Sequence, residues 1–168
     1  MIQITETERL FIREFNIKDT ASLSTILLNP EVMRYTFRNI SSIKDIESYI
    51  ENCLYNYKKY GFGQWAVTDK ISTQLIGICG LNSGFNGDNT IIHVNYRFAK
   101  EQWGHGFASE ALQSVINYAK IVLKIEMVYA LVEPDNDKSI KLAQNHGFQF
   151  EKETIYRERK LMFYKRII

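Results

Sequence analysis

Two glycines separated by one residue occur in the segment 103–108 (Trp-Gly-His-Gly-Phe-Ala), between a β-rich stretch and a helical one. Glycine lacks a Cβ, so its backbone can turn inward without a steric clash. Successive N–H groups of such a turn can point at one spot, at the positive end of the following helix. This arrangement suits a pyrophosphate, although the same turn can also serve only to start a helix.

The pattern around the two glycines excludes two other classes of phosphate site. The chain has no G-x-x-x-x-G-K-[ST] sequence, so a P-loop is excluded. A dinucleotide-binding turn follows the first strand of a parallel array and has a third glycine, where this chain has Ser109. Here the turn follows several hairpin-like strands, so we do not expect a Rossmann fold.

Charge and hydropathy argue against nucleic-acid and membrane partners. The 168 residues include 21 basic and 19 acidic side chains, a net charge of +2, which is too little for a polyanion-binding surface. No stretch approaches the ~20 apolar residues of a membrane span, and the N-terminus does not resemble a secretory signal. We therefore expect a cytoplasmic protein.

The two cysteines are predicted to be core residues. Cys53 and Cys79 each lie in an apolar segment, and their spacing matches no metal or redox motif. We therefore expect no metal site.

Two helices are predicted in the first third of the chain. Asp19 can cap a helix that runs to about residue 29, where Pro30 stops it. The next helix is better defined, because Ser42 and Asp45 form a capping-box-like pair. Apolar residues then recur at helical spacing until Gly61.

Several short segments have β character, and residues 84–89 (Gly-Phe-Asn-Gly-Asp-Asn) are predicted to form a loop between two of them. Residues 91–98 alternate between two distinct sets of side chains, as a strand with two different faces should. The predicted strands are residues 9–15, 65–69, 75–81, 91–98, 127–132, 148–152 and 161–166.

The second half of the chain is predicted to contain two helices. One begins at Phe107, and the other spans residues 136–146 and ends at Gly147 as its C-cap. The strand–helix–strand crossover over residues 91–132 implies one parallel strand pair, whereas hairpins dominate elsewhere. We predict one mixed α/β domain over residues 1–168, with a mostly antiparallel sheet of about six or seven strands.

The chain resembles the GNAT superfamily of N-acetyltransferases nearly end to end. The likeness is greatest to the branch of the ribosomal-protein-alanine N-acetyltransferases (RimJ/RimL-like). It implies a fold with helices on both faces of the sheet and a parallel pair that splays apart. The matching segments are residues 7–13, 29–35, 61–67, 75–81, 103–111, and Asn136 with Ser139 followed by Gly147-Phe148.

The resemblance implies acetyl-coenzyme A as cosubstrate, with its pantetheine arm between the splayed strands. Backbone groups of Tyr96, Arg97 and Phe98 would bond the arm, and an N–H near Val94 or Asn95 would polarise the thioester carbonyl. Asn136 would bind the pantetheine and Ser139 the sulfur. The residues implied at the pyrophosphate are Trp103, Gly104, His105, Gly106, Phe107, Ala108 and Ser109.

Two departures from the family pattern affect these roles. Glu101 stands where a basic residue or glutamine is frequent, so one side-chain contact to the donor is lost. Ala143 stands where many relatives have a tyrosine general acid, so Ser139 inherits that role. The alternative is that Ser139 only helps the helix start, because serine near a helix N-terminus can satisfy free N–H groups.

His93 occupies the position where many relatives have a carboxylate base. Histidine suits proton transfer near neutral pH, but we favour the alternative, a strand histidine that faces solvent or a polar layer. Tyr156, Arg157 and Glu158 can likewise either line the acceptor mouth or be ordinary strand-edge residues.

The function implied is transfer of an acetyl group from acetyl-CoA to a primary amine, by direct attack in a ternary complex. The amine can belong to a protein or peptide N-terminus or to a small molecule such as a polyamine, an aminoglycoside or an amino acid. A free α-amine, with a pKa of ~8, loses its proton more easily than a lysine, with a pKa of ~10.4. The alternative is a non-catalytic CoA- or peptide-binding module, and the protein can be a monomer or a homodimer.

Overall fold

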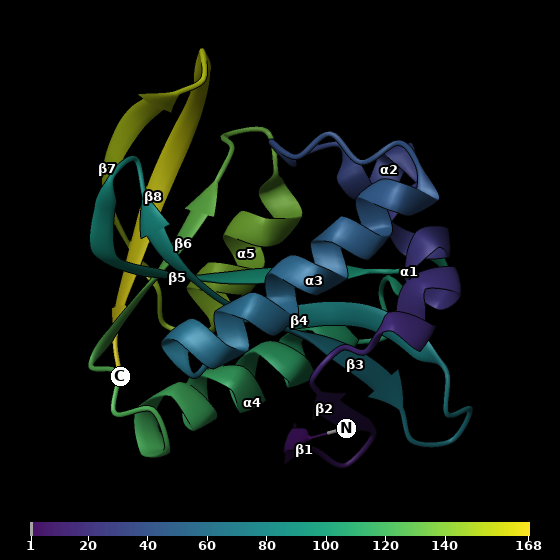
Figure 1. Ribbon diagram of the computed structural model, residues 1–168. Coiled ribbons are helices and arrows are strands. Elements are labelled where there is room, and N and C mark those ends of the chain that lie inside the picture. The colour runs from purple at the N-terminus through teal and green to yellow at the C-terminus, as the bar shows by residue number, and fades with distance from the viewer. Residues whose placement is uncertain (1) are drawn as a thin grey trace.

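Eight strands form one mixed sheet in the computed structural model, which describes residues 2–168 (Figure 1). The strands are β1 (Gln3–Glu6), β2 (Leu10–Arg13), β3 (Gln64–Asp69), β4 (Leu75–Phe85), β5 (Asp88–Phe98), β6 (Met127–Val132), β7 (Gln149–Tyr156) and β8 (Arg159–Ile167). Their order is β1-β2-β3-β4-β5-β6-β8-β7. The pair β5–β6 is parallel and the other neighbouring pairs are antiparallel, as predicted.

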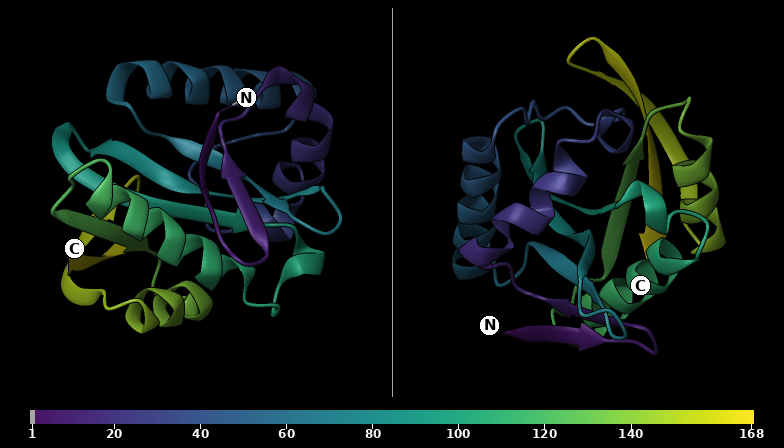
Figure 2. Two further views of the ribbon diagram at one scale, coloured as in Figure 1. Left: turned by 90° about the horizontal axis from the view of Figure 1, so that it is seen from below. Right: turned by 90° about the vertical axis from the view of Figure 1, so that its right-hand side faces the viewer.

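Helices cover both faces of this sheet (Figure 2). One face carries α1 (Thr20–Leu27), α2 (Pro30–Met33) and α3 (Ile43–Tyr60), and the other carries α4 (Phe107–Ile121) and α5 (Asp137–Asn145). Each layer buries its own apolar cluster against the sheet, with Ile46 and Ile50 of α3 in one, and Leu112 and Val115 of α4 in the other. No helix in the described part of the chain is long and apolar enough to cross a membrane.

The long helix α3 begins and ends as the sequence predicts. The Ser42 hydroxyl accepts a hydrogen bond from the Asp45 N–H, and the Asp45 carboxylate accepts one from the Ser42 N–H in return. At the other end Gly61 takes a left-handed conformation with φ +76°, which glycine adopts without a Cβ penalty.

The start of α1 differs from the prediction. The Asp19 side chain makes no capping hydrogen bond to α1. It forms instead a two-pronged ion pair with Arg13, with N–O distances of 2.8 Å, and accepts the Asn16 N–H at 2.9 Å. Pro30 does not only stop a helix, because it is also the first residue of the short helix α2, where its missing N–H is harmless.

Three β features also differ from the prediction. The edge strand β1 was not predicted, since its four residues bury little apolar surface. The predicted loop over residues 84–89 is wrong, because β4 continues to Phe85 and β5 starts at Asp88. The last two strands are longer than predicted and meet at Arg157 and Glu158, which both have positive φ. That conformation matches the twist of a tight hairpin, and this hairpin projects beyond the rest of the sheet (Figure 1).

Candidate active site

The parallel strands β5 and β6 separate almost at once. They share one paired position, His93 with Tyr129, whereas β5 pairs with β4 along nearly its whole length. From Val94 onward, the β6-facing edge of β5 is therefore not paired with another strand. Free N–H and C=O groups on such an edge can bind an extended ligand as an added strand.

A cavity of about 640 Å³ lies beside this opening. Residues 93–97 of β5 form one wall, and residues 130–132 of β6 with the following Glu133 face them. The segment between α2 and α3 contributes further side chains. The cavity brings together seven of the predicted site residues: His93, Val94, Asn95, Tyr96, Arg97, Asn136 and Ser139. Tyr156 and Arg157 also line it, and Glu158 is not among its lining residues.

The predicted phosphate turn has the backbone geometry that the glycines imply. Gly104 and Gly106 both have φ +81°, and Gly106 is the N-cap residue of α4. No side chain caps this helix start, so its first N–H groups are available to a ligand. An anion at that position would also gain from the helix dipole.

Arg9 and Glu110 form an ion pair that contacts the turn. The Arg9 guanidinium donates to the Glu110 carboxylate at 2.6 Å and to the His105 carbonyl at 3.0 Å, and it lies 4.5 Å from the Phe107 ring centroid. Burial favours a higher pKa for Glu110, but hydrogen bonds from Thr7 and Arg9 lower it below its usual value. Sequence reasoning missed this support, because its two partners are far apart in the chain.

The other turn residues and Phe98 lie outside the cavity, and several of their groups are used within the protein. The Trp103 indole N–H donates to the Phe98 carbonyl at 2.9 Å. The Ser109 hydroxyl is 2.8 Å from Nε2 of His146. Phe107 and Ala108 pack against the α4 core cluster. A ligand at the turn is therefore offered mainly backbone groups.

The first turn of α5 is capped by Asn136 rather than by Ser139. The Asn136 side-chain oxygen accepts the Ser139 N–H at 3.2 Å. The alternative in which the Ser139 side chain helps to start the helix is thus not supported. Ala143, at the family's tyrosine position, is fully buried.

A second hydroxyl, which sequence reasoning missed, lies at the start of α5. Tyr96 donates from its hydroxyl to the Ser139 carbonyl at 3.3 Å. Burial raises the pKa of Tyr96 to about 12, so the phenol is protonated at neutral pH and can donate a hydrogen bond. Because side chains alternate along a strand, Tyr96 lies on the face of β5 opposite to the face that carries His93 and Asn95.

His93 lines the cavity, but its surroundings change the chemistry expected of it. Burial lowers the pKa of His93 to about 4, although the backbone of Val94 and of Gly84 acts in the opposite direction. The imidazole is therefore neutral at pH 7 and a weak base. A pH dependence near 6–7 is not expected from this residue.

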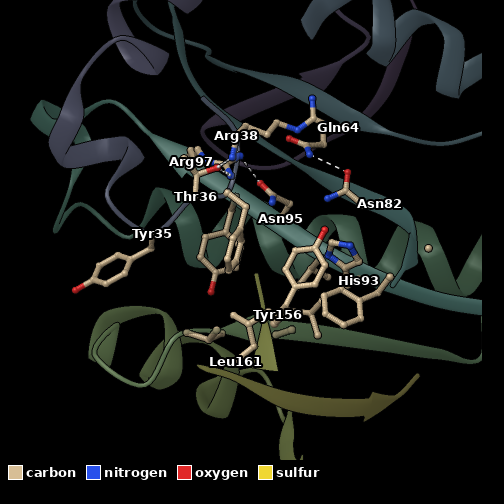
Figure 3. A pocket seen from close by; sticks show the side chains of 18 of the residues that line it. Tyr35, Thr36, Arg38, Gln64, Asn82, His93, Asn95, Arg97, Tyr156 and Leu161 are labelled. Atoms are coloured by element: carbon tan, nitrogen blue, oxygen red, sulfur yellow. Dashed lines mark hydrogen bonds between the residues drawn. The ribbon is translucent and has the colours of Figure 1, made fainter. Parts of the chain in front are cut away.

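A chain of hydrogen-bonded polar side chains also escaped sequence reasoning, and Figure 3 shows its Gln64–Asn82 part. The Tyr49 hydroxyl donates to the Gln64 side-chain oxygen, and the Gln64 amide donates to the Asn82 oxygen at 2.8 Å. Gln64 is only 5% exposed. A glutamine within an otherwise apolar strand was the signal available in the sequence, since buried polar groups need partners.

Comparison with known proteins places these features in a family. The model of the acetyltransferase (GNAT) domain matches residues 9–149. The chain is 32% identical over 149 residues to an uncharacterized N-acetyltransferase, p20, of Bacillus licheniformis, covering 86% of this chain and 82% of the relative.

Solved structures share the fold at lower identity. A putative ribosomal-protein-serine acetyltransferase from Vibrio cholerae is 19% identical, with a TM-score of 0.83 over 99% of this chain and 98% of that one. The ribosomal L7/L12 α-N-protein acetyltransferase RimL in complex with coenzyme A is 16% identical, with a TM-score of 0.82 over 99% and 98% of the two chains. The chain belongs to the GNAT family of acetyltransferases.

Proposed function

We propose that this acetyltransferase transfers an acetyl group from acetyl-CoA to a primary amine, with both substrates bound together. The observation that carries the proposal is that the unpaired edge of β5 and the glycine turn before α4 follow each other along the chain. The open edge of β5 leads into the positive-φ turn at the start of α4. An extended arm along the strand edge and a pyrophosphate at the helix start match the two ends of coenzyme A.

The residues of the site fit this cosubstrate. Backbone groups of residues 96–98 would bind the arm, and the amides that open α4 would bind the pyrophosphate. The free amide N–H groups of the Asn136 side chain are available as donors, since its oxygen holds the cap. Acetyl-CoA would supply an acetyl group already activated as a thioester, so the proposal requires no metal.

Hydrogen-bond donors near the reacting atoms are the chain's main chemical contribution. An N–H at Val94 or Asn95 would stabilise negative charge on the acetyl oxygen, an effect worth ~3–4 kcal/mol in other enzymes. The Ser139 hydroxyl would donate to the departing sulfur. The Tyr96 hydroxyl uses its hydrogen to bond the Ser139 carbonyl, so it would hold the start of α5 in place rather than donate to the sulfur. Neutral His93 would orient the amine by accepting one of its hydrogens.

A CoA-release assay tests the proposal. Acetyl-CoA is incubated with the protein and a panel of small amines and alanine-initiated peptides, and free thiol is measured with mass analysis of the acceptor. We expect acetylated amine and free thiol in equal amounts. In Gly106→Val we expect much less of both products. Thiol release without any acetylated amine, or no release with any acceptor, would contradict the proposal.

A further inference from the structure

Arg97 carries a positive charge into the cavity without a carboxylate partner. Its guanidinium donates to the Asn95 side-chain oxygen at 2.8 Å and to the Thr36 hydroxyl at 3.0 Å. Both partners are neutral. No Asp or Glu side chain in the described part of the chain lies within 4.0 Å of this guanidinium.

A second guanidinium lies on the same wall. Arg38 also lines the cavity, and its charged group lies 5.3 Å from the Tyr49 ring centroid. Figure 3 shows Arg38 and Arg97 side by side, next to Thr36 and Asn95. Burial lowers the pKa of Arg97; Tyr49 acts in the opposite direction, and the Arg38 cation lowers the pKa further. Arg97 is half-buried and Arg38 is exposed, so two like charges lie on one wall of the cavity, an arrangement that costs free energy.

The rest of the cavity lining does not compensate these charges. Among the described residues that line the cavity, Glu133 alone is acidic, and both of its carboxylate oxygens accept hydrogen bonds from Arg159. Arg157 adds a third guanidinium to the lining. Arg38 and Arg157 are exposed, but Arg97 is half-buried and its hydrogen-bond partners are neutral. Because charges removed from water are normally paired, Arg97 points to a negative group that arrives with the ligand.

We propose that the acceptor is a small amine that also carries an anionic group, a carboxylate or a phosphate, bound between Arg38 and Arg97. This inference rests on the proposed function and names its acceptor class. Guanidinium groups bind such oxygens with two parallel hydrogen bonds. A polyamine or an aminoglycoside would instead bring positive charge to this wall.

The position of the arginine pair limits the length of the acceptor. Asn95 and Arg97 are two residues apart on one face of β5, a separation of about 7 Å along a strand. The proposed N–H at Val94 or Asn95 sets the point of reaction. The amine and the anion therefore belong to one small molecule, only a few bonds apart, as in an amino acid.

Matched acceptors test the proposal without relying on one compound. The kcat/KM is measured for β-alanine against β-alaninamide, and for 2-aminoethyl phosphate against ethanolamine, so that carboxylate and phosphate are separated. We expect at least one anionic member to exceed its neutral partner by about tenfold or more, mainly through KM. Charge-assisted hydrogen bonds have this strength.

Arginine variants then locate the anion. Arg38→Gln should reduce the preference for the anionic acceptor by about tenfold or more while leaving the KM for acetyl-CoA unchanged. Arg34→Gln is the matched control, because Arg34 is exposed on the same segment but does not line the cavity. For Arg97→Lys both the acceptor preference and the melting temperature are measured, because Arg97 also donates a hydrogen bond to Thr36 and its loss can lower stability. The product N-acetyl-β-alanine should raise the melting temperature of the parent more than that of Arg38→Gln.

The outcomes separate this inference from the proposed function. No acetylated product with any acceptor would overturn the proposed function itself. Acetylation with equal kcat/KM for charged and neutral members, or equal effects of Arg38→Gln and Arg34→Gln, would overturn only the anion site. A neutral alanine-initiated peptide acetylated better than every anionic small amine would overturn it as well.

Discussion

The turn that opens α4 and the cavity beside β5 differ in the atoms that they offer to a ligand. The turn offers backbone N–H groups, fixed by two glycines with φ +81° and supported by Arg9. The cavity offers side chains that come from six strands, β3 to β8, from α3 and α5, and from the segment between α2 and α3. A backbone site depends on local conformation, whereas a side-chain site depends on which distant residues meet.

The largest expected effect is a loss of folding stability at acid pH, caused by His93 in the cavity. The pKa of His93 is about 4, against ~6.5 for an unfolded histidine. Between these values the unfolded chain binds a proton that the folded chain does not, so stability is lost as pH falls from about 6.5 to 4. At ~1.36 kcal/mol per pKa unit, His93→Gln should remove up to ~3 kcal/mol of that loss.

Denaturant unfolding at pH 7 and pH 4.5 measures this difference, with His105→Gln as the control, because His105 is exposed on the turn. An equal pH dependence of stability in the parent and in His93→Gln would show that His93 is not desolvated.

The turn should respond to a change of backbone freedom alone. Gly106→Val forces a β-branched residue into φ +81°, which should weaken CoA binding by ~1–3 kcal/mol through strain and lost approach. Titration calorimetry measures the affinity. Gly61→Val is the matched control, since Gly61 has φ +76° but lies far along the chain, at the end of α3. If both variants bind CoA like the parent, the donor site lies elsewhere.

Changes at the start of α5, where Asn136 and Ser139 line the cavity, should lower the turnover number. Ser139→Ala should lower kcat by ~10-fold with CoA affinity nearly intact. Tyr96→Phe removes the hydrogen bond to the Ser139 carbonyl and tests whether that bond positions Ser139. The melting temperature of Ser139→Ala should stay close to that of the parent. Asn136→Ala, which removes the cap, should cost ~1 kcal/mol of stability. Turnover of Ser139→Ala within twofold of the parent would leave that hydroxyl without a chemical role.

Chelation should have the smallest effect. Because backbone amides supply the positive end of the donor site, CoA affinity measured with and without EDTA should agree within error. Affinity that vanishes in EDTA would mean that a cation, rather than the α4 amides, holds the pyrophosphate.

Local patterns in the sequence were sufficient for part of this structure. The capping box at Ser42, the left-handed Gly61 and the turn at Gly104 and Gly106 each depend on a few neighbouring residues. The alternation along β5 likewise placed His93, Asn95 and Arg97 on one face, and all three line the cavity. Each of these features is set by backbone conformation or by strand geometry.

Pairings between side chains of different elements could not be predicted in the same way. Asp19 was predicted to cap a helix, but its carboxylate forms an ion pair with Arg13. The Arg9–Glu110 pair and the Arg97–Thr36 bond each join segments separated by many residues. Whether a polar side chain caps, pairs or faces a ligand is decided by its tertiary neighbours, which one sequence does not reveal.

The ion pair between Glu133 and Arg159 has a consequence for the source of basicity in catalysis. An amine that enters as an ammonium ion could give its proton to Glu133 only by breaking that pair, and His93 is too weak a base to accept it. The neutral fraction of the free acceptor should therefore control the rate. The pH profile would then belong to the substrate: it should shift upward in step with the amine's own pKa when one acceptor is exchanged for a more basic one.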